Sequence, residues 1–169
     1  MCMFVAAAQI LCFVLQPVAP AQNSAIGGLL ISGDVATPLT LSATDLKNMP
    51  RRTLKVAVPR ENKENVYEGV AIRELLRRAI VPHDEKLRFR PMTVYVRAEG
   101  ENDRMAFSFA DFDPGAQDSE VIVADTLNGL PLGEQKGPLE LIEPSYKGHV
   151  RTVRMLKSLR VLGAVPERE

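Results

Sequence analysis

Cysteine is scarce in this 169-residue sequence, which has only two, Cys2 and Cys12, both close to its start. The stretch from residue 13 to residue 169 contains none. A disulfide framework, a thiolate nucleophile and a cysteine-bound metal all require cysteine, so all three are excluded for that stretch.

Histidine, aromatic residues and net charge are also limited. The two histidines, His83 and His149, lie far apart and show no metal-ligand spacing. Tryptophan is absent, aromatic residues make up 5% of the chain, and 21 basic side chains balance 21 acidic ones. The chain therefore offers neither the basic surface nor the stacking platforms that nucleic acids require. We predict no nucleic-acid partner and no metal held by protein ligands.

The motifs of several large enzyme classes are missing as well. No Gly-x-Ser-x-Gly elbow is present, and Gly27 and Gly28 precede a strand pattern, not the helix of a phosphate-binding loop. Asp111, Asp113 and Asp118 lack the spacing and the closing glutamate of a calcium loop, so we interpret them as turn residues. The sequence does not predict a conventional hydrolase or kinase.

The N-terminal segment is apolar and ends in small residues. The apolar run over residues 3–15 carries no charge and is too short to span a membrane. Residues 19–21 read Ala-Pro-Ala, a pattern that a signal peptidase accepts. We predict a cleaved signal peptide over residues 1–21, a single domain over residues 22–169 and a periplasmic location. A buried N-terminal helix is the alternative interpretation.

Short strands dominate the rest of the chain. Alternating apolar residues bounded by turn residues predict most of them, and an Asn-Gly turn is expected at residues 128–129. With few helices among these strands, the pattern predicts an α+β fold built on mixed β-sheets. The expected strands cover residues 29–32, 52–59, 92–100, 104–112, 120–124, 138–144 and 156–163.

Two helices are expected. Residues 42–50 predict a short one, with Ser42 as N-cap, Asp45 in the first turn and Pro50 as the stop. The main helix follows Gly69, which we expect to turn the chain, and its arginines are expected to face solvent. Its apolar residues are Val70, Ile72, Leu75, Leu76 and Ala79, and its arginines are Arg73, Arg77 and Arg78.

Basic residues gather in the stretch "GPLELIEPSYKGHVRTVRML" at residues 137–156, although the chain as a whole is neutral. Guanidinium groups offer paired donors that match phosphates and polar heterocycles, so Lys147, Arg151 and Arg154 are candidate ligand-binding residues. A short helical turn would place Arg151 and Arg154 on one face. The alternative is a solvated surface with Val150, Val153 and Leu156 packed inward.

Four motifs give the chain a resemblance to a known family. They are YEGV followed by a leucine-rich helix, ADTLNGLPL, GPLEL, and the later Arg151-x-x-Arg154. Over about residues 29–162 the sequence resembles the oxidoreductase molybdopterin-binding domain of the sulfite-oxidase and methionine-sulfoxide-reductase family. The resemblance implies the sulfite-oxidase-type fold and a pterin or molybdopterin cofactor, over which the last segment closes. The resemblance implies that Lys147, Arg151 and Arg154 bind the cofactor, and the full set of candidate cofactor-binding residues is Tyr146, Lys147, His149, Arg151 and Arg154.

The chain departs from the enzymatic members of that family at the metal. Those members hold molybdenum through a cysteine on the strand before the aromatic-x-Gly-Val motif, where this sequence has Val56 to Val58. An aliphatic side chain cannot replace an anionic sulfur ligand. Ser145 and Tyr146 also stand where small members often show Gly-Asp.

The combined expectation is an exported pterin-binding protein without molybdenum catalysis or a protein-ligated metal. It would act as a ligand-responsive partner of an inner-membrane signalling or redox protein. The alternative is a molybdopterin-dependent oxidoreductase that passes electrons to a separate cytochrome. A third interpretation is a structural interaction module whose pocket stays empty.

Overall fold

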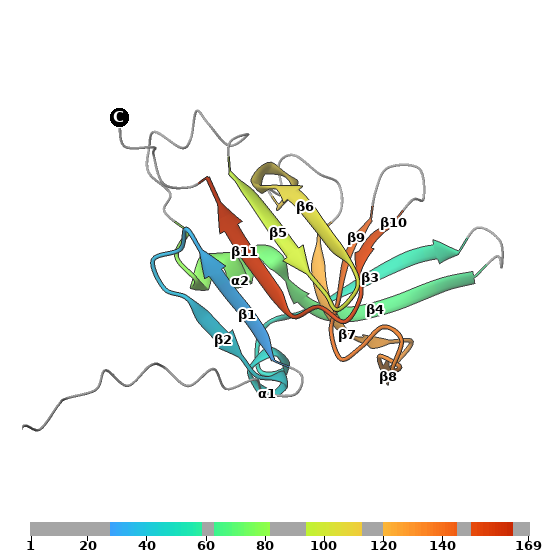
Figure 1. Ribbon diagram of the computed structural model, residues 1–169. Helices are drawn as coiled ribbons and strands as arrows, with labels where there is room; N and C mark the ends of the chain where they lie inside the picture. The colour runs from blue at the N-terminus through green and yellow to red at the C-terminus, as the bar shows by residue number, and fades with distance from the viewer. Residues whose placement is uncertain (1–27, 59–62, 82–93, 113–119, 145–149, 164–169) are drawn as a thin grey trace, which may run out of the picture.

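Two β-sheets form the framework of the structure, a computed structural model that describes residues 28–58, 63–81, 94–112, 120–144 and 150–163 (Figure 1). The first sheet has five strands in the order β2-β1-β11-β5-β6. The second has six, in the order β10-β9-β7-β4-β3 with β8 paired to β7. The β1–β11 pair is parallel and the antiparallel pairs surround it, which confirms the predicted α+β fold with mixed pairing and few short helices.

The elements of the described chain are short. In the first sheet the strands are β1 (Leu29–Gly33), β2 (Leu39–Leu41), β5 (Tyr95–Glu99), β6 (Arg104–Ser108) and β11 (Ser158–Leu162). In the second they are β3 (Arg51–Val58), β4 (Lys63–Ala71), β7 (Ile122–Leu127), β8 (Leu130–Pro131), β9 (Glu140–Pro144) and β10 (Val150–Val153). The helices are α1 (Ala43–Lys47), α2 (Ile72–Arg78) and the 3-10 turn η2 (Phe109–Phe112).

Two local features predicted from the sequence are confirmed: the cap at the start of α1 and the tight turn between β7 and β8. The Ser42 hydroxyl accepts a hydrogen bond from the Asp45 amide at 3.2 Å, and the Asp45 carboxylate accepts one from the Ser42 amide at 2.8 Å. This reciprocal pair is a capping box, which fixes the start of α1. Asn128 and Gly129 both adopt positive φ, as the tight turn between β7 and β8 requires.

Gly69 does not turn the chain, contrary to the prediction. It lies inside β4, at a shift in the register between β4 and β7. A Cβ added at Gly69 would come within 2.0 Å of the carbonyl oxygen of Val123, so the β7 backbone packs directly against this position. Gly69 allows β4 and β7 to approach each other closely, and the helix begins only at Ile72.

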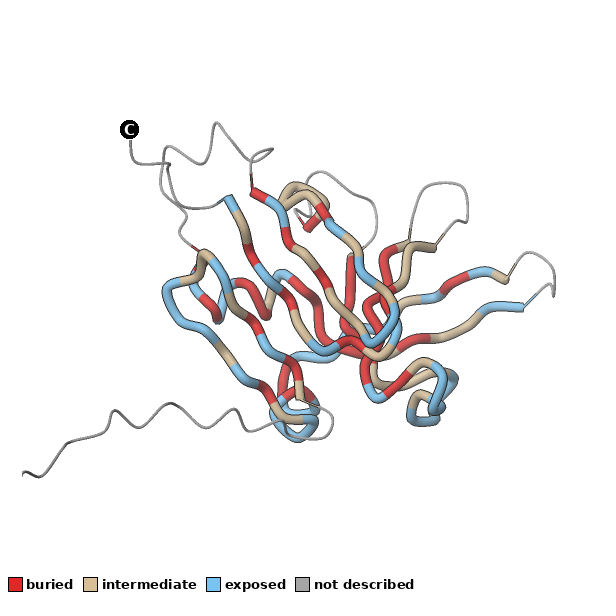
Figure 2. Tube along the Cα trace, in the orientation of Figure 1, coloured by how far each residue is buried: buried red, intermediate tan, exposed pale blue. Residues whose placement is uncertain are grey.

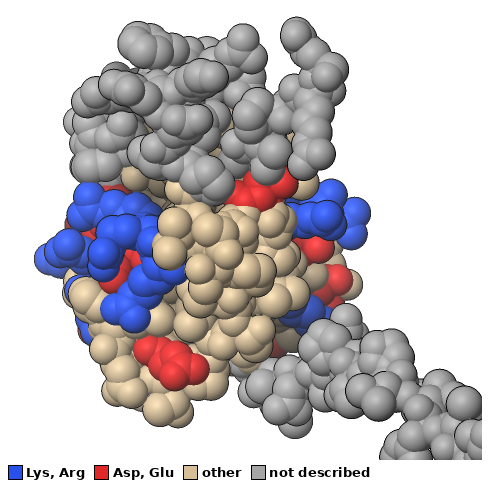
Figure 3. All heavy atoms as spheres, turned by 90° about the vertical axis from the view of Figure 1, so that its left-hand side faces the viewer, with Lys and Arg blue, Asp and Glu red and all other residues tan. Residues whose placement is uncertain are grey.

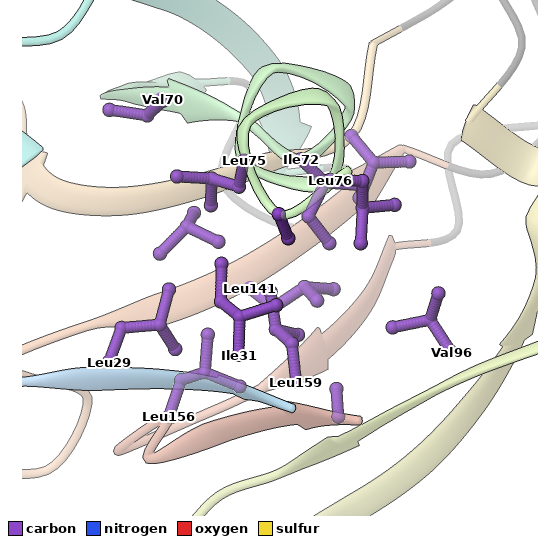
Figure 4. Packing of buried hydrophobic residues seen from close by; sticks show 14 of the residues in the cluster. Leu29, Ile31, Val70, Ile72, Leu75, Leu76, Val96, Leu141, Leu156 and Leu159 are labelled. Atoms are coloured by element: carbon purple, nitrogen blue, oxygen red, sulfur yellow. The ribbon is translucent and has the colours of Figure 1, made fainter. Parts of the chain in front are cut away.

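The main hydrophobic core lies between the two sheets and is covered by α2. Ile72, Leu75 and Leu76 are buried on one side of this helix and point toward residues of both sheets, including Ile31 and Leu141 (Figure 4). The predicted arginines lie on the other side of α2 and pair with carboxylates of Glu74 and Glu120. An amphipathic helix that packs on the sheets thus explains the periodicity in the sequence.

The second sheet is buried on both faces near its centre. Along β7, Val123 belongs to the main core, whereas its neighbours Ile122 and Ala124 belong to a smaller cluster with Val56 and Tyr67. Because side chains alternate along a strand, these clusters lie on opposite faces of the sheet. Buried residues concentrate where β7 and β9 cross the molecule, and the far end of the β3–β4 hairpin is more exposed (Figure 2).

On the side that lies at the left of Figure 1, the surface of the described residues is uncharged at its centre, with basic side chains on both flanks and acidic ones among and below them (Figure 3). Among the described residues, no helix is long and apolar enough to cross a membrane.

Candidate ligand-binding site

The segment that carries the predicted arginines forms a strand. Residues 150–153 are β10, which pairs with β9, so the expected helical turn is wrong. Arg151 lies within β10 and Arg154 follows its last residue. Since strand side chains alternate, residues three apart do not share a face, and the two arginines contact different groups. Tyr146, Lys147 and His149 lie outside the residues that the structure describes, as does His83.

Arg151 holds a buried carboxylate. It stands opposite Glu143 in the β9–β10 register, and its Nε and Nη2 both donate to the Glu143 carboxylate. Nη2 also lies 3.4 Å from Oδ2 of Asp111, and the guanidinium carbon is 5.0 Å from the centre of the Phe107 ring. The Glu143 side chain is only 2% exposed.

Two carboxylates therefore surround one guanidinium at Arg151. The hydrogen bonds to Glu143 raise the pKa of Arg151 further above its ordinary value. Arg151 and its two acidic partners sum to one negative charge, which does not attract a phosphate. The geometry of the described residues gives Arg151 a positioning role: it fastens β10 to β9 beside the 145–149 segment.

Arg154 lies at a hollow in the surface of about 280 Å³. Its backbone amide and its Nε both donate to Oδ2 of Asp103, each at 3.2 Å. The Arg154 side chain remains 54% exposed, so part of the guanidinium faces solvent. The residues that line the hollow are Asn102, Asp103, Gln135, Arg154 and Met155.

Three segments that are distant in the sequence meet at this hollow. The Met155 amide donates to the Lys136 carbonyl at 2.9 Å, which joins the end of β10 to the segment between β8 and β9. The β5–β6 turn approaches from the other side (Figure 1), where a Cβ added at Gly100 would come within 2.0 Å of the Arg154 carbonyl oxygen. Gly100 thus permits the contact that brings Asp103 to Arg154.

A buried carboxyl and a second cation lie close to the hollow. Glu140, on β9, is 2% exposed, and its Oε2 has no hydrogen-bond partner among the described residues. The charges of Lys136, Arg154 and Asp103 all act on it, but burial dominates and raises the pKa of Glu140.

Lys136 is anchored beside the ring of Tyr67. Its Nζ donates to the Tyr67 hydroxyl at 3.0 Å and lies 5.4 Å from the centre of the ring. Burial lowers the pKa of Lys136, but the bond to Tyr67 and the charge of Glu140 outweigh it, so the net shift is upward. Lys136 therefore stays protonated.

These residues were not identified by the sequence patterns. Lys136, Glu140 and Asp103 belong to different segments, and their proximity comes from long-range pairing. One signal was available: Glu140 interrupts the apolar stretch from Leu139 to Ile142, and an acid in a strand that is buried on both faces is unusual.

Arg154 lines the hollow and can donate to a small anionic group, whereas Lys136 lies near Arg154 with its Nζ bonded to Tyr67 and is not a lining residue. The end of β3 does not fit a metal. The strand β3 ends in Val56, Ala57 and Val58, whose side chains offer no metal ligand. No group of three or more potential metal ligands occurs within the described ranges.

The two-sheet α+β fold carries a polar hollow between loops, and small ligands generally occupy concave sites. Comparison with known families identifies the family: the chain belongs to the oxidoreductase molybdopterin binding domain family, whose model matches residues 20–168. This confirms the resemblance noted in the sequence.

A solved structure supports the same fold. The chain is similar to the sulfane dehydrogenase SoxCD from Paracoccus pantotrophus, with a TM-score of 0.60 and 22% sequence identity. The match covers 80% of this chain and 38% of the SoxCD chain, so this chain spans well under half the length of that protein. No curated protein matches.

Proposed function

We propose that this chain is an exported protein that binds a pterin of the molybdopterin type without molybdenum catalysis. One observation carries the proposal: the segment that matches the family, residues 20–168, contains no cysteine. In this family the cysteine thiolate is the protein's ligand to molybdenum, and molybdopterin supplies redox chemistry through that metal. Without the thiolate, the domain retains the means to bind the organic part of the cofactor.

The residues of this chain divide the binding between two places. Arg154 holds the anionic end of the ligand at the hollow, and the nearby charge of Lys136 adds to the attraction. Arg151 anchors β10 to β9 through Glu143. Tyr146, Lys147 and His149, which lie outside the described residues, are kept as further candidate ligand contacts. The occupied domain then acts on an inner-membrane partner, which responds to the presence of the ligand.

Titration of a fluorescent pterin phosphate tests the binding site. A charge-assisted hydrogen bond is typically worth about 1.5–3 kcal/mol, so Arg154→Ala should weaken binding roughly ten- to a hundredfold. Arg154→Lys should recover only part of the loss, because an ammonium lacks the planar fork. The control is Arg77→Ala on α2, where the Arg77 side chain is 72% exposed. Equal affinity in wild type, Arg154→Ala and Arg77→Ala would remove Arg154 from the site.

Export is tested at the N-terminus. We expect protein recovered from the periplasm to begin at Gln22, because the small residues 19–21 precede it. N-terminal sequencing or intact mass measures this directly. Uncleaved protein that stays in the cytoplasm would contradict the proposed location.

A further inference from the structure

We propose that the hollow beside Arg154 binds an anion together with one proton, and that Glu140 holds this proton. The inference rests on the proposed function in taking the hollow as the ligand site, and it adds how that site is regulated. Three observations carry it: the hollow that Arg154 lines, the charges of Arg154 and Lys136 that both act on Glu140, and the buried carboxyl oxygen of Glu140 that has no partner in the described structure.

The net charge around Glu140 determines how strongly the hollow attracts an anion. Lys136 comes from the segment between β8 and β9, Arg154 from the end of β10 and Asp103 from the β5–β6 turn. On β7 the residue paired with Glu140 is Ala124, which carries no charge. With Glu140 ionised, the two cations and two carboxylates cancel, whereas a protonated Glu140 leaves one net positive charge.

Asp103 cannot take the place of Glu140 as the proton acceptor. Hydrogen bonds from the backbone and side chain of Arg154 lower the pKa of Asp103. Burial has the opposite effect on Glu140 and favours its neutral form. An anion that approaches Arg154 and Lys136 favours the neutral form further, because it removes the attraction those cations exert on the carboxylate.

Proton uptake makes anion affinity depend on pH. One coupled proton strengthens binding up to tenfold for each unit by which the pH falls, over the range in which Glu140 is ionised in the free protein and protonated in the complex. A neutral glutamine of the same shape at position 140 should remove this dependence. At alkaline pH the Glu140→Gln variant should then bind the anion more tightly than wild type does.

The size of the hollow matches a small anion or the phosphate end of a larger ligand. Pockets that enclose whole drug-sized ligands measure roughly 300–1,000 Å³, and this one is about 280 Å³. The remainder of a pterin would lie outside it.

Calorimetric titration of sulfate into the full chain tests the inference, because sulfate keeps its charge throughout the relevant pH range. Titrations between pH 5.5 and pH 8.5, at constant ionic strength and in two buffers of different ionisation enthalpy, count the protons taken up per anion. We expect proton uptake in wild type that passes through a maximum, at pH values between the pKa of Glu140 in the free protein and its pKa in the complex, and none in Glu140→Gln. Arg154→Ala should lose sulfate binding.

Several outcomes would overturn the inference. They are the absence of saturable sulfate binding at pH 5.5, sulfate binding without proton uptake at any pH, or uptake that persists in Glu140→Gln. The wild-type proton count is decisive even if a variant fails to fold. A pterin that binds without proton uptake removes this inference and keeps the proposed function. If sulfate binds with proton uptake but no pterin binds, the proposed function is wrong and this inference stands.

Discussion

Arg151 forms an ion pair that stabilises the fold, although the sequence predicts that it contacts a ligand. Its guanidinium neutralises Glu143, a carboxylate that is almost completely buried. An ionised carboxylate in such a place is tolerated only when a partner compensates its charge. The position of Arg151 beside the 145–149 segment is therefore fixed by folding energetics before any ligand arrives.

Arg151→Ala should destabilise the protein, because it leaves the Glu143 carboxylate buried without its partner. Allowing for solvent access to the guanidinium, we expect a loss of about 2 kcal/mol, or roughly 4–8 °C in Tm. Thermal unfolding followed by circular dichroism measures this. The matched control is Arg154→Ala, whose partner Asp103 is solvent-accessible, and which should melt close to wild type. Equal melting of both variants would contradict the positioning role of Arg151.

Prediction from the sequence succeeded for residues whose signals are local. Ser42 and Asp45 lie three apart and cap their own helix, so the sequence alone identifies them. The cluster of Glu140, Lys136 and Asp103 is not local, since it depends on contacts between three distant segments. Of the two predicted site residues that the structure describes, only Arg154 lines the hollow, because cationic clustering is visible in sequence whereas proximity is not.

At the scale of the elements, β10 explains the main error. The spacing of Val150, Val153 and Leu156 is compatible with a helical turn, and local propensity does not exclude one. In the folded chain the edge of β9 offers hydrogen bonds to residues 150–153, and this pairing decides the conformation. The strand then separates the two arginines that a helix would have aligned.

The close backbone approach between β4 and β7 near the centre of the second sheet requires Gly69. A Cβ at this position would meet the Val123 carbonyl oxygen at 2.0 Å, so Gly69→Ala must displace β7. We expect a loss of about 1–3 kcal/mol in the free energy of unfolding, measured by urea denaturation.

Gly133→Ala provides the comparison. No atom lies within 4 Å of a Cβ added at Gly133, so this variant should stay within about 0.5 kcal/mol of wild type. If Gly69→Ala proved as stable as Gly133→Ala, the role assigned to the close strand approach would be wrong.

At the scale of the whole molecule, the family and the fold agree. The family model spans residues 20–168, and the two sheets reproduce the fold of a sulfite-oxidase-type domain. The sequence predicted the family, because membership depends on residue identity at motif positions and not on long-range geometry. That residues 56–58 stand where the family's enzymes carry the metal-binding cysteine stays a prediction from the resemblance.

The central claim is that the domain binds a pterin and does not hold molybdenum through a protein thiolate. The most direct measurement is the composition of protein purified from a host that makes the molybdenum cofactor, with molybdenum measured by elemental analysis and the released ligand by mass spectrometry. We predict a pterin retained with the protein and molybdenum far below one atom per chain. About one molybdenum per chain, or protein that retains no pterin and binds none on titration, would contradict the account.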